Sequence, residues 1–116
     1  MALDLTLPAT VAAAARRGLE LRREYGRGGT LVGVARARDL GNRRTLSLDT
    51  VRRMASFLAR HAVDLEAPAA KVGHPDYPSA GRIAWLLWGG DAGRTWASKI
   101  LKQQARLEEL AKKGTE

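Results

Sequence analysis

The segment from residue 41 to residue 61, GNRRTLSLDTVRRMASFLARH, combines basic side chains with the pattern of an amphipathic helix. Ser47 is a good helix N-cap, and Asp49 falls in the first turn, where the helix dipole favours an anion. Apolar residues recur every three or four positions and predict a buried side, which leaves the basic residues on the opposite side. Because the guanidinium fork matches phosphate oxygens, the pattern predicts a phosphate-binding face. The candidate nucleic-acid-binding residues are Arg43, Arg44, Arg52, Arg53, Ser56 and Arg60.

The distribution of charge favours the same chemistry. The chain of 116 residues has a formal net charge of +8, and from Arg16 to Arg60 twelve arginines stand against four acidic residues. From His61 onward, eight basic residues are nearly balanced by seven acidic ones. A GC-rich coding sequence would explain arginine in place of lysine, but not the difference between the two halves. The surplus favours nucleic acid as partner, with a solvated basic surface or an acidic protein partner as alternatives.

The connection between the predicted helices 30–41 and 47–61 decides between two kinds of DNA binding. A short helix, a turn and a second helix with an outward basic face are the parts of a helix-turn-helix, whose second helix enters the major groove. However, the connection is longer than the three or four residues usual for that motif. We therefore expect a helix-turn-helix-like pair that holds mainly the phosphate backbone of double-stranded DNA, with low sequence specificity and strong salt dependence.

All three tryptophans lie between residues 77 and 97, in YPSAGRIAWLLWGGDAGRTWA. The pattern predicts an apolar helix that begins after Ser79 and ends at Gly89 and Gly90, and a further helix capped by Asp91. Such a helix corner needs no ligand, and the stretch lacks the GK[ST] ending and the preceding strand of a phosphate-binding loop. The alternative is a protein-docking surface formed by Arg82, Trp85 and Arg94.

Other residues that often carry chemistry form no diagnostic pattern. The chain has no cysteine, which excludes disulfides, thiolate ligands and cysteine nucleophiles. His61 and His74 lie near Asp64 and Asp76, but this spacing is not typical of a metal site. No serine lies in a nucleophile elbow. We therefore expect a non-enzymatic protein with no cofactor and no metal.

Hydrophobic periodicity predicts helices over residues 9–25, 30–41, 47–61, 79–89 and 91–114, and no strand. The stretch from 62 to 78 holds three of the four prolines and cannot be continuous helix. Its apolar residues favour packing on the core over a mobile linker; they are Val63, Leu65, Val72 and Tyr77.

We expect residues 1–116 to form one all-α domain, because a chain of this length can bury a sizeable core. The predicted architecture is a compact bundle of four to five short helices with a longer C-terminal helix. From about Lys102 onward that helix is too polar to be core and is expected to project. Its apolar spacing of three and four, continued from Trp96 to Leu110, would allow self-association.

The apolar runs of the chain are much shorter than a bilayer span. Asp4 stands where an export signal would carry positive charge. We therefore expect no membrane contact and a cytoplasmic location.

Three stretches together resemble a small domain of tailed-phage and prophage proteins. They are AARRGLELRREYGRGGTLVGVARARDL, LSLDTVRRMASFLARH and GHPDYPSAGRIAWLLWGGDAGRTWA, and they cover roughly residues 13–97. That domain occurs alone or attached to prohead-protease and other virion-assembly proteins. The resemblance implies a location in the host cytoplasm or on the virion, near head assembly or packaged DNA, and it supplies no catalytic residues. We therefore expect a phage-associated DNA-binding protein, with a protein-interaction module in virion assembly, contacting phage structural proteins, as the alternative.

Overall fold

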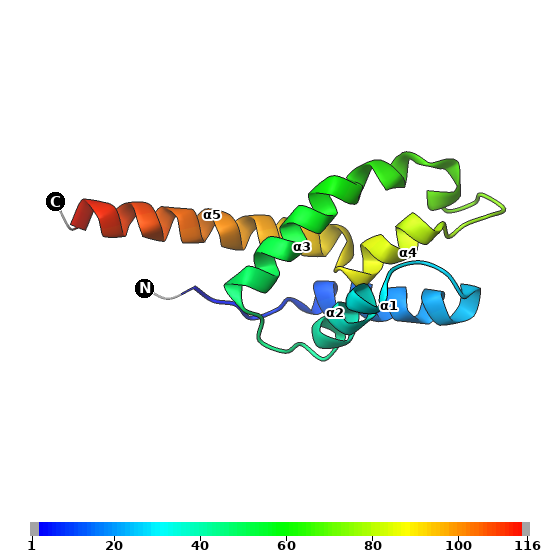
Figure 1. The fold of residues 1–116 in the computed structure, drawn as a ribbon, viewed down its shortest axis with the longest axis horizontal. Coiled ribbons are helices and arrows are strands. Elements are labelled where there is room, and N and C mark those ends of the chain that lie inside the picture. The colour runs from blue at the N-terminus through cyan, green and yellow to red at the C-terminus, as the bar shows by residue number, and fades with distance from the viewer. Residues whose placement is uncertain (1–2, 115–116) are drawn as a thin grey trace.

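The computed structural model describes residues 3–114, which form five α-helices and two short 3-10 helices (Figure 1). No strand occurs in this range, so the all-α prediction is confirmed, including the longer C-terminal helix. The elements in chain order are α1 (Ala9–Tyr25), α2 (Leu31–Gly41), α3 (Leu48–His61), η1 (Ala62–Glu66), η2 (Pro68–Ala70), α4 (Ala80–Leu87) and α5 (Gly90–Gly114).

Local capping determines where most of these helices begin. The side chains of Thr30, Ser47 and Ser79 accept hydrogen bonds from backbone N–H groups in the first turns of α2, α3 and α4. The predicted cap of α5 is wrong, because α5 begins at Gly90 and Asp91 lies inside its first turn. The chain turns between α4 and α5 through left-handed backbone at Gly89 and Gly90, with φ values of 109° and 64°, which favours glycine at both positions.

The helices form two packed groups that share α5. Helix α1 packs against α2, α4 and α5, and α3 packs mainly against α5. The core between them is aliphatic except for the tryptophans, and its fully buried members include Val11, Leu40, Met54, Leu58 and Trp85. Helices α2 and α3, predicted as a helix-turn-helix-like pair, both form but do not pack against each other. The recognition geometry of a helix-turn-helix is therefore absent.

The stretch between α3 and α4 contains the two 3-10 helices and a cis peptide bond between Tyr77 and Pro78. Leu65 packs against the core as expected. Val63 and Val72 do not, because they are 64% and 85% exposed. The prediction that the apolar residues of this stretch are buried is therefore only partly confirmed.

Helix α5 extends beyond the core. Its last buried residue is Ile100, and Leu101 packs partly against the core. Beyond that point the helix extends away from the other helices to Gly114 (Figure 1). The molecule is consequently elongated, with extents of 59, 27 and 21 Å. No helix within residues 3–114 is long and apolar enough to cross a membrane.

Candidate nucleic-acid interface

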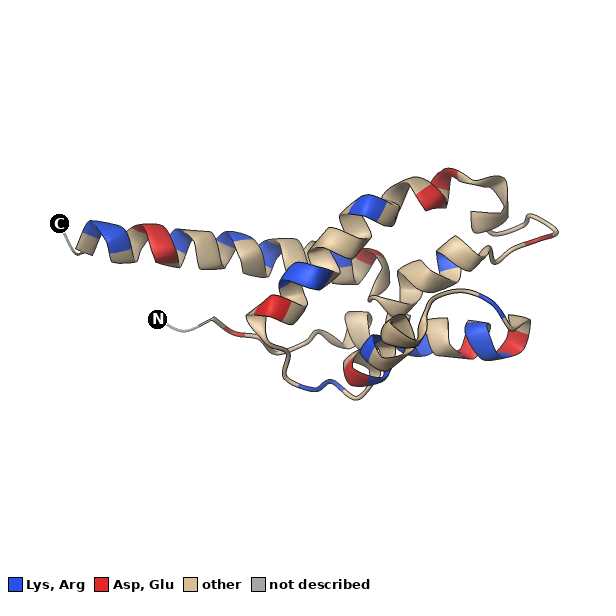
Figure 2. Cartoon of the chain, viewed as in Figure 1, with Lys and Arg blue, Asp and Glu red and all other residues tan. Residues whose placement is uncertain are grey.

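Helix α3 has one buried side and one basic side. Val51, Met54 and Leu58 recur at helical spacing and are completely buried. On the opposite side, the predicted residues are exposed to solvent and extend over about two turns. Figure 2 shows blue, basic segments along α3. The exposed set is Arg52, Arg53, Ser56 and Arg60.

A shallow hollow of about 350 Å³ lies on this basic side. The α3 side chains surround it, and Trp88, at the end of α4, closes one wall. The lining residues are Arg52, Arg53, Ser56, Phe57, Arg60 and Trp88. The structure therefore brings four of the six predicted nucleic-acid-binding residues into one concave surface.

An aromatic stack supports the hollow. The ring of Phe57 lies between the rings of Trp88 and His61, with centroid distances of 4.5 and 4.2 Å. The guanidinium of Arg36, on α2, lies 5.6 Å from the centroid of Trp88. Stacking and cation–π attraction of this kind contribute favourably and restrict side-chain motion. The stack thus links α2 to α3 through Trp88, although the two helices do not pack directly.

The basic side of α3 is weakly neutralised. Arg52 is 3.2 Å from the carboxylate of Asp49, and both side chains are exposed. Such surface ion pairs contribute little, so Arg52 can exchange its carboxylate for a phosphate. The Nε–H of Arg60 donates to the Ser56 carbonyl over 3.4 Å, which leaves its terminal nitrogens outside that bond. Arg53 makes no hydrogen bond or ion pair within residues 3–114.

The two arginines that precede α3 are engaged elsewhere. Arg43 donates from Nε and Nη2 to the carbonyl of Leu7, at 3.1 and 2.7 Å, and it adopts a left-handed backbone with φ of 51°. Arg44 lies 3.8 Å from Asp39 and has a 70% exposed side chain. Neither residue lines the hollow. Arg43 therefore holds the N-terminal segment, whereas Arg44 stays near the surface beside an acid.

The tryptophan corner is structural at its centre. Trp85 is only 1% exposed, and its Nε1–H donates to the Asp91 carboxylate at 2.9 Å. Arg82 donates to the Ala70 carbonyl at 2.9 Å, which fastens α4 to η2. Because Trp85 is buried, the predicted docking surface of Arg82, Trp85 and Arg94 does not exist as one surface. The helix-corner interpretation fits this geometry.

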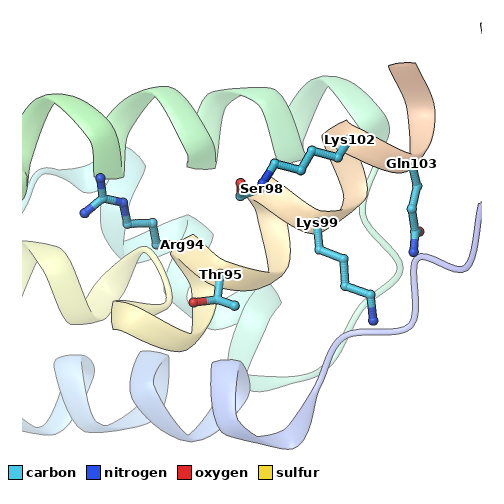
Figure 3. A pocket seen from close by; sticks show the side chains of 6 residues that line it. All are labelled: Arg94, Thr95, Ser98, Lys99, Lys102 and Gln103. Atoms are coloured by element: carbon cyan, nitrogen blue, oxygen red, sulfur yellow. The ribbon is translucent and has the colours of Figure 1, made fainter. Parts of the chain in front are cut away.

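Arg94 belongs to a different surface, on α5. It lines a hollow of about 550 Å³ whose lining residues all come from that helix (Figure 3). In Figure 3, Arg94 extends toward α3, Lys102 runs back along α5 toward Ser98, and Lys99 points toward the N-terminal segment. Sequence analysis missed Lys102, although its spacing of eight residues from Arg94 places both on one helix face.

The histidines have simple local partners. His61 Nδ1 lies 3.0 Å from the Asp64 carboxylate, and His74 Nδ1 accepts from the backbone N–H of Asp76 at 3.0 Å. Over residues 3–114 no group of three or more histidine, cysteine or acidic side chains is arranged to hold a metal ion.

Comparisons with protein-family models, with curated proteins and with solved structures found no match to this chain.

Proposed function

We propose that this protein is a non-enzymatic nucleic-acid-binding protein that holds double-stranded DNA mainly through its phosphate backbone. The observation that carries the proposal is the exposed arginine side of α3, with Arg52, Arg53 and Arg60 around one hollow and Asp49 as the nearest acid on that helix. Arginine is suited to this task because its planar fork can donate two parallel hydrogen bonds to one phosphate.

The mode of binding follows from the fold. Helix α3 lacks the packing partner of a recognition helix, so no element presents it to the major groove in the helix-turn-helix manner. Phosphate contacts release condensed counterions and do not depend on base sequence. The proposed protein therefore binds duplexes of any sequence, and its affinity falls steeply as salt rises.

A charge reversal on α3 tests the proposal. In Arg53→Glu, we expect the affinity for an arbitrary duplex at 50 mM salt to fall about tenfold or more, because a charge-assisted hydrogen bond contributes about 1.5–3 kcal/mol. Arg52→Glu combined with Arg53→Glu should abolish binding. The matched control is Arg23→Glu, which alters the net charge as much as Arg53→Glu does but lies on α1, which does not contact α3.

The control separates a local site from general attraction. If Arg53→Glu and Arg23→Glu lower the duplex affinity equally, only the net charge of the protein matters, and α3 is not the DNA-binding surface. Circular dichroism of each variant confirms that the helices are retained.

The proposed DNA-binding function fits a protein of a tailed phage or prophage. The resemblance described above supports this context and implies a location in the host cytoplasm or on the virion. DNA that is being packaged is a polyanion of the required kind.

A second function, protein interaction in virion assembly, is favoured by the free part of α5. Leu107 is half-buried and Leu110 is 46% exposed on a helix that extends beyond the core. Such a helix can dock or self-associate through its apolar residues. If it does so, light scattering will show an oligomer that Leu107→Asp converts to a monomer without affecting DNA affinity appreciably.

A further inference from the structure

A groove between α3 and α5 continues the arginine side of α3. Two adjoining hollows, of about 430 and 420 Å³, lie between these helices and share Ala55, Leu101 and Ala105. The second also shares Arg52 and Ser56 with the hollow beside Trp88. The concave surface therefore runs without interruption from the arginine side of α3 into the groove.

Small side chains keep this groove open. Its floor is formed by Ala55 and Ala59 from α3 and by Leu101 and Ala105 from α5. Leu101 and Ala105 lie just beyond Ile100, the last buried residue of α5. Alanine fills little of the space between two packed helices, whose axes are typically about 8–10 Å apart.

Both rims of the groove carry positive charge. Arg52 stands on the α3 rim, and Arg94 and Lys102 stand on the α5 rim. Arg94 and Lys102 make no hydrogen bond or ion pair within the described range of the chain. The only acidic side chain that lines either hollow in this range is Glu108, at the end near the α5 tail. An anionic ligand therefore finds attraction from both sides.

We infer that the α5 rim supplies a second set of phosphate contacts, so that one DNA backbone lies in the groove between Arg52 on α3 and Arg94 and Lys102 on α5. This inference rests on the proposed function and extends it to a second helix. Eight residues separate Arg94 from Lys102, which gives about 12 Å along the α5 rim. On α3 the same spacing leads from Arg52, which lines the groove, to Arg60, which lines the adjoining hollow beside Trp88.

The floor of the groove argues against an acidic peptide as the occupant. Protein-binding grooves usually hold an aromatic or aliphatic anchor in a well-packed central pocket. Here the floor consists of three alanines and one leucine, and none of the described residues that line it is aromatic. The features specific to this groove are the cationic side chains on its rims, Arg52, Arg94 and Lys102.

The salt dependence of binding tests the inference quantitatively. Each phosphate contact contributes about 0.9 to the slope of log affinity against log salt. Arg52, Arg53 and Arg60 alone give a slope of about −2.7, or about a 40-fold loss between 50 and 200 mM salt. With Arg94 and Lys102 the slope becomes about −4.5, and the loss is about 500-fold.

The decisive variant is Arg94→Ala with Lys102→Ala, assayed on an arbitrary duplex. We expect its slope to be smaller than that of the wild type by about 1.8, with binding still detectable at 50 mM salt. Arg23→Glu changes the net charge by the same amount and should keep the wild-type slope. A double variant with the wild-type slope would overturn the α5 contacts and leave the proposed function standing. Wild-type protein that fails to bind duplex at 50 mM salt would overturn both.

A binding assay with an acidic peptide tests the competing interpretation, that the groove holds a protein partner. If a poly-glutamate peptide binds the wild type and loses affinity in the double variant, while duplex binding is unchanged, the groove belongs to a protein partner and the inference is wrong. Loss of duplex affinity with the reduced slope supports it.

Discussion

The close approach of α1 to the backbone of α4 makes Gly18 a sensitive test of the fold. A Cβ atom added at Gly18 would lie 2.8 Å from the backbone nitrogen of Leu87 and 3.0 Å from the carbonyl carbon of Leu86. Favourable carbon–carbon contacts are about 3.5–4.0 Å, so the helices would have to separate by roughly half an ångström. Backbone atoms cannot rotate away as a side-chain end can.

The size of the effect follows from two opposing contributions. Overpacking of this kind costs about 1–3 kcal/mol. Alanine in place of glycine within a helix returns about 0.5–1 kcal/mol. We therefore expect Gly18→Ala to lower the free energy of unfolding by about 1–2 kcal/mol. Urea unfolding followed by fluorescence of the three tryptophans should show a midpoint lower by about 0.5–1 M.

Gly41→Ala is the matched control. There the added Cβ would lie 3.1 Å from Cγ of Arg16, a side-chain atom that has to move by only a few tenths of an ångström while the guanidinium keeps its hydrogen bond to the Gly41 carbonyl. We expect a midpoint close to that of the wild type. If Gly18→Ala unfolds at the wild-type urea concentration or higher, the tight α1–α4 packing described here is incorrect.

Three further predictions concern residues outside the basic surface. Arg43→Ala should lower the free energy of unfolding by about 1–3 kcal/mol, because two charge-assisted hydrogen bonds to the N-terminal segment are lost; a large drop in duplex affinity with unchanged stability would contradict its structural role. Hydrogen bonds from the side chain and backbone of Thr6 hold the pKa of Asp4 below its ordinary value. The ionised Asp4 carboxylate therefore stabilises the folded state at pH values above its pKa in the unfolded chain, and this stabilisation is lost as the pH falls through its pKa in the folded protein. In Thr6→Ala, an NMR titration should show the pKa of Asp4 shifted upward, and no shift would refute the side-chain contribution. Trp85→Phe should destabilise the protein by about 1–3 kcal/mol, because the carboxylate of Asp91 loses its donor, while duplex affinity stays the same; unchanged stability with reduced duplex affinity would contradict its structural role.

The helices were predictable because their signals are local. Thr30, Ser47 and Ser79 each lie next to the turn that they cap, and the apolar spacing of α3 follows from neighbouring positions along the chain. Asp91 misled the prediction, because an acidic residue in the first turn of a helix looks the same in sequence whether it caps the helix or follows the cap. In the structure the Asp91 carboxylate accepts a hydrogen bond from Trp85, six residues earlier.

The candidate site was predictable in part for the same reason. The basic side of α3 follows from helical periodicity alone. The sequence does not show that Arg43 reaches Leu7, that α2 and α3 are separated, or that Trp88 bridges them, because those features depend on distant contacts. The α5 rim was not predicted, because the position of Arg94 and Lys102 opposite the alanines of α3 depends on how the two helices pack.

The central claim is that the basic surface holds the phosphate backbone of DNA. The most direct test is the affinity of the wild-type chain for a duplex of arbitrary sequence, measured at 50 and 200 mM salt. With five phosphate contacts, from Arg52, Arg53, Arg60, Arg94 and Lys102, we predict binding at the lower salt and about a 500-fold weaker affinity at the higher salt. Absence of binding at 50 mM salt, or an affinity that does not change with salt, would contradict the account.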